Sequence, residues 1–344
     1  MLFVITAVSA IVPSLLLIWY FWARDVQREP GKVLWATFGL GVLSVVPVLA
    51  VELPLSWLIK KTGDPYVQGT LQAFFGAAAP EEAFKLLVLL LYCDRLPDFD
   101  EPMDGIVYGA VASLGFATLE NVLYVGSGGL SIAVLRAATA VPGHAFWGAT
   151  LGYYVGQAKF FPANRRRLIL SGYLLAFAMH GVYDAPLLTL GALNKLGVPA
   201  GGASVMVAAT LASFVLSWAF VGRQVRRLRA DQLHVAAVRA LQAGMEPPAG
   251  VLTAAPPTAG ARLAGALLIA AGALLASLGV LVTAALGLAM LAPSEHAADR
   301  SAVIVGGLLL GPVPFGAGLA LFASGLRRRR VQAPLSPWVS RSPH

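Results

Sequence analysis

Residues 69–92 read GTLQAFFGAAAPEEAFKLLVLLLY, an apolar run whose only charged side chains are Glu81, Glu82 and Lys85. About 20 apolar residues in a helix span the hydrocarbon core of a bilayer. An ionisable side chain at that depth costs about 2.5 to 3.5 kcal/mol by insertion scales, so it marks a functional site by default. This stretch therefore predicts a membrane helix with functional charges.

The rest of the chain has the same character. It is 58% hydrophobic and only 12% charged, with a mean hydropathy of +0.74, whereas a soluble domain carries about 25% charged residues. Its apolar windows predict an all-α polytopic membrane protein with about nine transmembrane helices. The expected spans are residues 2–23, 33–51, 69–92, 104–126, 131–157, 168–190, 203–222, 264–292 and 302–325.

The basic residues predict the orientation of these spans. If the N-terminus lies outside, 19 of the 25 Lys and Arg residues fall in cytoplasmic segments and four in outer ones. Cytoplasmic loops of membrane proteins carry this excess, so we expect an outer N-terminus and a cytoplasmic C-terminus. The net charge of +8 thus reflects topology, and no nucleic-acid partner is expected. The single cysteine, Cys93, excludes a disulfide framework.

Three segments differ in composition. Residues 1–222 contain every ionisable residue expected at mid-membrane depth and form the working helical core. Residues 223–261 are a basic cytoplasmic juxtamembrane segment, with helical spacing suited to an anionic lipid surface, followed by a Pro/Ala linker. Residues 262–344 are expected to form a two-helix hairpin with a basic tail.

Four consecutive predicted helices carry acids and imidazoles at similar depths. Counting about 1.5 Å per residue from each predicted helix end places Glu81, His144 and His180 about 18 to 20 Å inside the membrane. We therefore expect one shared cavity. The full set of candidates is Glu81, Glu82, His144 and His180 as catalytic residues, with Lys85, Glu120, Asn121 and Asp184 in support.

Spacing within the helices predicts two pairs. Glu81 and Lys85 are four residues apart, as are His180 and Asp184, so each pair shares a helix face. Glu82 points about 100° away from Glu81 and is free for another partner. A carboxylate beside an imidazole fixes its tautomer.

Glutamate and histidine around a water can carry out general-base hydrolysis, with or without a metal. His144, His180 and Glu82 can supply three ligands and leave the open position of a catalytic zinc. Lys85, however, would repel a dication. The cofactor is therefore left open between none and a divalent metal such as zinc.

Small residues indicate close helix packing in the same region. Gly105, Gly109 and Ser113 are four residues apart in one span, and Gly148 begins a similar row in the next. Pro80, and Pro142 with Gly143, are expected to interrupt backbone hydrogen bonding next to the candidate residues.

The same residues also allow interpretations other than hydrolysis. Taken singly, each charged pair can be a structural ion pair. A transporter or proton-coupled carrier would also place acids and histidines at the midplane, and a catalytically silent membrane scaffold would retain such a cluster. The His-Glu-x-x-His zinc motif of site-2 proteases and the Gly-x-Gly-Asp motif of presenilin-type enzymes are both absent, which argues against these two classes. The serine-containing run at 126–129 is expected in an outer loop, which argues against a rhomboid-type serine protease.

Four motifs resemble those of the PrsW family of intramembrane proteases, relatives of the CAAX prenyl endopeptidases. They are Glu-Glu-Ala-Phe-Lys at 81–85, Phe-Ala-Thr-Leu-Glu-Asn at 116–121, His-Ala-Phe-Trp-Gly at 144–148 and His-Gly-Val-Tyr-Asp at 180–184. The resemblance covers about residues 30–222.

The resemblance implies an intramembrane peptidase in the bacterial cell membrane, surrounded by lipid. Its substrate would be a single-pass membrane protein, since some members cleave a membrane-anchored anti-sigma factor. By resemblance, Glu81 and Glu82 activate the water, and His144 and His180 complete the site. The prenyl endopeptidases have a histidine where this chain has Glu120.

Overall fold

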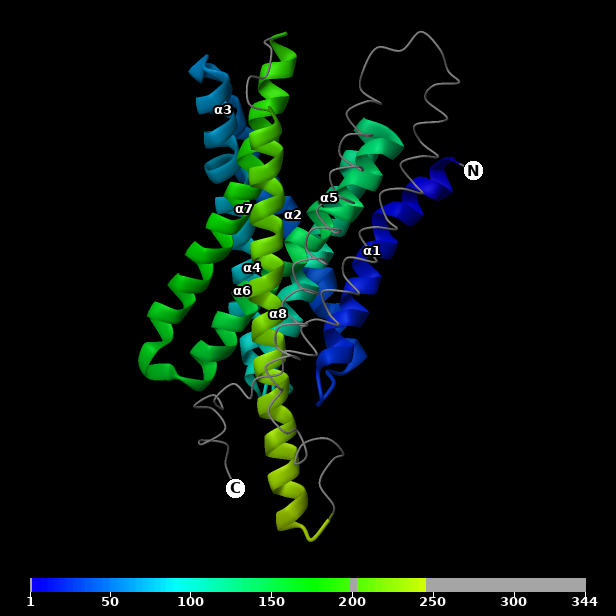
Figure 1. The fold of residues 1–344 in the computed structure, drawn as a ribbon, viewed down its shortest axis with the longest axis vertical. Helices are drawn as coiled ribbons and strands as arrows, with labels where there is room; N and C mark the ends of the chain where they lie inside the picture. Colours follow the sequence, from blue (N-terminus) through cyan, green and yellow to red (C-terminus); the bar gives the residue numbers. More distant parts are fainter. Residues whose placement is uncertain (1, 198–202, 246–344) are drawn as a thin grey trace, which may run out of the picture. The chain divides into compact units, whose positions relative to one another are not determined.

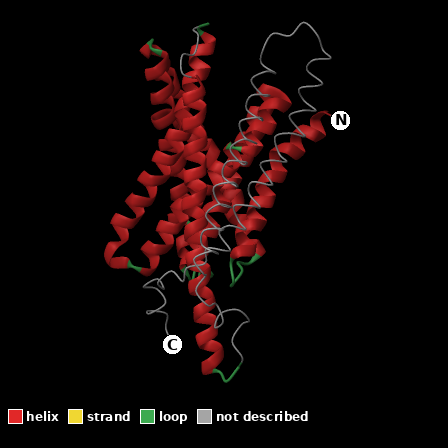
Figure 2. Cartoon of the chain, viewed as in Figure 1, coloured by secondary structure: helices red, strands yellow, loops and turns green. Residues whose placement is uncertain are grey.

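The computed structural model describes residues 2–197 and 203–245, and every element in these ranges is a helix (Figure 1; Figure 2). The all-helical prediction is confirmed for this part of the chain. The elements are α1 (Leu2–Arg24), α2 (Gly31–Ile59), η1 (Lys60–Thr62), α3 (Pro65–Leu71), η2 (Gln72–Ala78), α4 (Ala79–Leu91), η3 (Cys93–Arg95), α5 (Pro102–Ala138), α6 (Ala140–Phe160), η4 (Pro162–Asn164), α7 (Arg165–Lys195) and α8 (Ala203–Gln242).

Four helical stretches in the described ranges are long and apolar enough to cross a membrane: Gly31–Thr62, Pro102–Tyr124, Pro162–Lys195 and Ala203–Gln242. A shorter apolar helix covers Ile11–Arg24. The spans expected at 264–292 and 302–325 lie outside the described residues, as do the linker after α8 and the hairpin. The count of nine spans, the orientation of the termini and the three-segment division therefore stay predictions.

The boundary between the fourth and fifth expected spans was wrong. We expected helices at 104–126 and 131–157 with an outer loop between them, but α5 runs unbroken from Pro102 to Ala138 and the break falls at Thr139. The glycine-rich run at 126–129 is therefore helical. Glycine lowers helix propensity by only about 1 kcal/mol per residue, which the surrounding helix can overcome.

This boundary changes the expected place of His144. Because α6 starts at Ala140, His144 is the fifth residue of its helix and does not lie deep within it. Pro142 does not interrupt α6 but sits in its first turn, where a backbone N–H has no helical partner to lose. The N–H of Gly143 donates to the carbonyl oxygen of Thr139 at 2.9 Å, closing that turn.

The stretch quoted at the outset forms a helical rod that starts before residue 69. Asp64 caps α3 by accepting hydrogen bonds from the backbone N–H groups of Tyr66 and Val67 at 2.8 and 2.9 Å. The rod continues through η2, a π-helical segment, into α4. Irregular backbone is thus present just before the two glutamates, as Pro80 suggested. The π-helical segment ends two residues before this proline.

The contacts group the described residues 2–127, 139–197 and 203–229 into one compact unit. Within it, α6 packs along α7, and α4 contacts α2, α6 and α7. The first half of α5 is its most enclosed element, because residues 102–118 are all buried. The candidate residues Glu81, Glu82 and His144 lie near the starts of α4 and α6, within this packed unit.

The predicted glycine rows join α5 to α6. A Cβ atom at Gly109 would collide with the carbonyl oxygen of Gly148, and one at Gly105 would collide with that of Gly152. The two backbones therefore touch directly, as the small-residue spacing indicated. This contact places His144, four residues before Gly148, against α5.

Candidate active site

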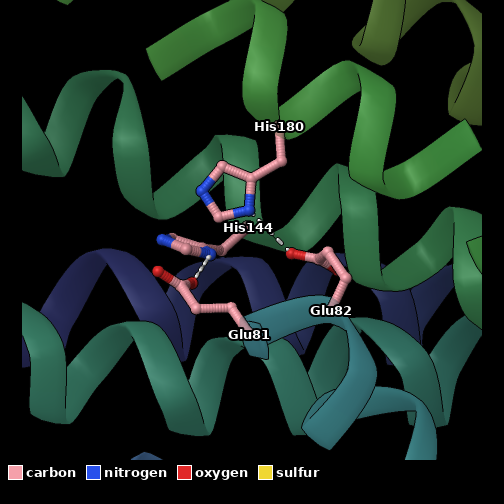
Figure 3. A group of neighbouring side chains, drawn as sticks. All are labelled: Glu81, Glu82, His144 and His180. Carbon is pink, nitrogen blue, oxygen red and sulfur yellow. Dashed lines mark hydrogen bonds and ion pairs between the residues drawn. The ribbon is translucent and has the colours of Figure 1, made fainter. Parts of the chain in front are cut away.

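Three helices bring the four predicted catalytic residues together (Figure 3). Glu81 and Glu82 come from α4, His144 from α6 and His180 from α7, and one ligand atom from each lies within 4.8 Å of the others. All four are buried, with exposed fractions of 4%, 0%, 2% and 2% in that order. The sequence-based expectation that these side chains share one place agrees with this geometry.

Lys85 lies in the middle of the cluster. Its Nζ donates to Oε2 of Glu81 at 3.1 Å and to Oε1 of Glu82 at 2.9 Å. It also lies 2.9 Å from Nδ1 of His144 and 4.3 Å from the centre of the Phe116 ring. The sequence predicted only the first of these contacts, yet one buried ammonium group pairs with both carboxylates.

His144 connects α6 to α5 and α4. Its Nε2 lies 2.9 Å from Oε2 of Glu120, while its Nδ1 lies 3.8 Å from Oε2 of Glu81. Figure 3 shows the ring beside the Glu81 carboxylate. Glu120 is therefore the group that orients this imidazole, a partnership that spacing within one helix could not predict.

His180 has a carboxylate at each ring nitrogen. Its Nδ1 lies 2.9 Å from Oε1 of Glu82, and its Nε2 lies 3.1 Å from Oδ2 of Asp184. The second contact is the predicted pair within α7. The indole of Trp147 stacks on the imidazole, with ring centres 4.0 Å apart and planes 13° apart. This stacking and the two carboxylates fix the orientation of the ring.

The two histidines follow one pattern. Each turns Nδ1 toward the glutamates of α4 and Nε2 toward a further carboxylate, Glu120 or Asp184. A carboxylate behind an imidazole is the usual support of a metal-binding histidine and of a catalytic one. Oε2 of Glu82 is also buried without a hydrogen-bond donor in the described part of the chain. These donors fit a divalent metal in type and separation.

Two further polar residues, Asn121 and Glu52, belong to the surroundings of the site. Asn121, predicted as a supporting residue, is fully buried next to Glu120 in α5. Glu52 was missed, because the expected second span ended at residue 51, whereas α2 continues to Ile59. It lies close enough to Glu81 and Glu120 to interact with them electrostatically. The signal that could have identified Glu52 is the presence of an acidic residue within an apolar run.

Comparison with known proteins gives one consistent result. Residues 29–219 match the family described as PrsW family intramembrane metalloprotease. Protease PrsW of Geobacillus kaustophilus is 38% identical over 177 residues, which cover 51% of this chain and 76% of that protein. Protease PrsW of Bacillus subtilis is 35% identical over 179 residues, covering 51% and 79%. Protease PrsW of Clostridioides difficile is 32% identical over 185 residues, covering 51% and 76%.

No solved structure matches the chain. The matched region, residues 29–219, contains all eight predicted site residues and ends within α8. None of these similarities supports the transporter or carrier interpretation. The chain is a multi-pass bacterial membrane protein that belongs to the PrsW family of intramembrane proteases.

Proposed function

We propose that the cluster of Glu81, Glu82, His144 and His180 hydrolyses a peptide bond of a membrane protein. The observation that supports this most directly is their convergence from three helices, with ligand atoms within 4.8 Å of one another. A purely structural role would not require each imidazole to be held by a further carboxylate. Buried ionisable groups are costly, and here they are gathered at one point.

Glu81 is the general base. Its side chain keeps 6% of its surface exposed, whereas that of Glu82 keeps none. Oε1 of Glu82 is in addition shared between Lys85 and His180. A water molecule must reach the base and give up a proton to it, which favours Glu81.

Glu82 and Lys85 hold the charges of the site in place. Lys85 fixes one oxygen of each glutamate, so the carboxylates keep their direction when a proton moves. His144 and His180 then position the water or stabilise the oxyanion that forms at the attacked carbonyl. Preorganised groups of this kind each contribute about 10² to 10³ in rate.

If the site takes a divalent metal, Glu82, His144 and His180 would hold it. When bound, a divalent metal would polarise the attacked carbonyl and lower the pKa of the water. Lys85 already donates to Oε1 of Glu82 and to Nδ1 of His144. Its ammonium group and a metal would therefore compete for them, and the catalytic type depends on which one occupies the centre.

The substrate proposed is a single-pass membrane protein, such as a membrane-anchored anti-sigma factor. We also propose the nine-span topology with a cytoplasmic C-terminus, and the relationship to the CAAX prenyl endopeptidases. Residues 1–222 would then hold the chemistry, and residues 223–261 and 262–344 would be accessory.

Cleavage of a single-pass transmembrane peptide by the purified full-length protein in detergent tests this function. Glu81→Gln should lower the rate by about 10² to 10⁴, because the general base is lost. Glu82→Gln should also lower it, whereas Asp98→Asn, outside the cluster, should cleave at the wild-type rate. Metal content and activity before and after chelation, with zinc added back, decide the catalytic type. Wild-type rates in both glutamate variants would contradict the hydrolytic role of this cluster.

A further inference from the structure

A second cluster of carboxylates lies where the α1–α2 connection meets the start of α5. It consists of Asp25, Glu29 and Asp104, whose exposed fractions are 3%, 5% and 0%. One oxygen atom from each lies within 4.8 Å of the others. None of these residues belongs to the candidate active site.

Surrounding groups hold one oxygen of each carboxylate. Oδ1 of Asp25 accepts a hydrogen bond from the backbone N–H of Gln27 at 3.1 Å. Oε2 of Glu29 accepts one from the Tyr108 hydroxyl. Oδ2 of Asp104 accepts two, from the backbone N–H groups of Asp100 at 2.9 Å and Glu101 at 2.8 Å. The three carboxylates are therefore oriented before any ligand arrives.

The second oxygen of Asp104 is the observation that points to a ligand. Oδ1 is buried, and no hydrogen-bond donor reaches it from the residues that the structure describes. The carboxyl groups of Glu29 and Asp104 nevertheless lie within hydrogen-bonding distance of each other. Two ionised carboxylates repel at this distance unless a cation or a proton lies between them.

Two further acidic side chains, Asp25 and Asp100, interact electrostatically with Glu29. Like-charged groups that are held together by the fold gain most from a bound cation.

We infer that Asp25, Glu29 and Asp104 bind one hard divalent cation of the Ca²⁺ or Mg²⁺ class. The three donors are all carboxylate oxygens, which these ions prefer, whereas zinc sites are usually built with histidine or cysteine. Two oxygens on opposite sides of Ca²⁺ lie about 4.6 to 5.2 Å apart, and around Mg²⁺ about 4.0 to 4.2 Å. The limit of 4.8 Å on the separation of the donor atoms is compatible with either ion.

Such a cation joins two parts of the chain. Asp25 and Glu29 stand between α1 and α2, while Asp104 stands in the first turn of α5, next to Gly105 of the glycine row. Binding would fix the start of α5 to the α1–α2 connection. The inference does not depend on the proposed hydrolytic function.

Titration calorimetry of the full-length protein in detergent tests it, with CaCl₂ in one arm and MgCl₂ in the other. We expect saturable binding of at least one of the two ions, and a higher midpoint of thermal unfolding in its presence. Asp104→Asn should weaken binding by about tenfold or more, because a charged ligand becomes neutral. Asp98→Asn is the matched control and should bind as the wild type does.

Two further variants separate the possible outcomes. Glu29→Gln should show the same loss and replaces Asp104→Asn if that protein does not fold. Glu81→Gln should keep the binding, since it changes only the candidate active site. The inference is overturned if neither ion at millimolar concentration binds or raises the unfolding midpoint. It is equally overturned if binding survives in both Asp104→Asn and Glu29→Gln, or is lost in Glu81→Gln alone.

Discussion

Lys85 donates a hydrogen bond to Nδ1 of His144 across 2.9 Å, although both side chains can carry a positive charge. An ammonium group has no lone pair, so Nδ1 of His144 must be the acceptor and carries no proton. The ring proton is then on Nε2, which faces Glu120 at 2.9 Å. One contact thus determines the tautomer of a histidine in the candidate active site.

Replacing Lys85 by methionine should destabilise the fold. Lys85 is 1% exposed and forms ion pairs with two buried carboxylates. Removing one partner of a buried ion pair costs about 3 to 5 kcal/mol, because the other charge stays buried. Thermal unfolding in detergent should therefore occur at a lower temperature in Lys85→Met.

Two comparisons make this prediction specific. Lys60→Met removes an exposed lysine at the end of α2 and should unfold like the wild type. The double variant Lys85→Met with Glu82→Gln should recover part of the stability, because one uncompensated charge is gone, but it should not recover activity. An unchanged unfolding midpoint in Lys85→Met would contradict the role of the ion pair.

Glu120→Gln should lower the rate of catalysis by changing the tautomer of His144. It should not alter substrate binding, because Glu120 is proposed to act only on this imidazole. The amide can donate to Nε2, which favours the tautomer that cannot accept the hydrogen bond from Lys85. Loss of a carboxylate that orients a histidine costs about 10- to 100-fold. We expect kcat to fall by that amount while KM for the peptide stays close to the wild-type value.

Asp184→Asn should act in the same way through His180, which lies 3.1 Å from this carboxylate.

The conservative Glu120→Asp should retain part of the activity that Glu120→Gln loses, because it keeps the charge. A rise in KM without a fall in kcat would show that these acids contact the substrate and do not position the imidazoles.

Gly109→Ala should weaken the packing of α5 against α6. The added Cβ atom would collide with the carbonyl oxygen of Gly148, so the helices must separate. Overpacking of this kind costs about 1 to 3 kcal/mol. Gly39→Ala is the control, because a Cβ atom there meets nothing within 4 Å and improves helix propensity. Equal unfolding midpoints for the two variants would contradict a close backbone contact.

Contacts within one helix were predictable from the sequence. The pairs Glu81–Lys85 and His180–Asp184 follow from a spacing of four residues, and the structure contains both. The approach of α5 and α6 through their glycines followed from the same periodicity. Local geometry sufficed because helical residues four apart always share a face.

Contacts between helices were not predictable in the same way. The partnerships of Glu82 with His180 and of Glu120 with His144 depend on how far each helix is rotated and shifted against its neighbour. Hydropathy carries no such information. It also misplaced the break now seen at Thr139, since glycines within a continuing helix and glycines in a loop have the same letters.

The π-helical segment Gln72–Ala78 has a consequence for the direction of the two glutamates. A π-helix closes its hydrogen bonds one residue later than an α-helix does, so it holds more residues in each turn. Each residue of an α-helix turns the chain by about 100°, and one surplus residue rotates everything that follows by that angle. The rod's first part, α3, faces α7, and its last part, α4, also meets α2 and α6. The direction in which Glu81 and Glu82 point around the helix axis therefore depends on the surplus residue in the π-helical segment before them. The apolar pattern of α4 alone does not set this direction.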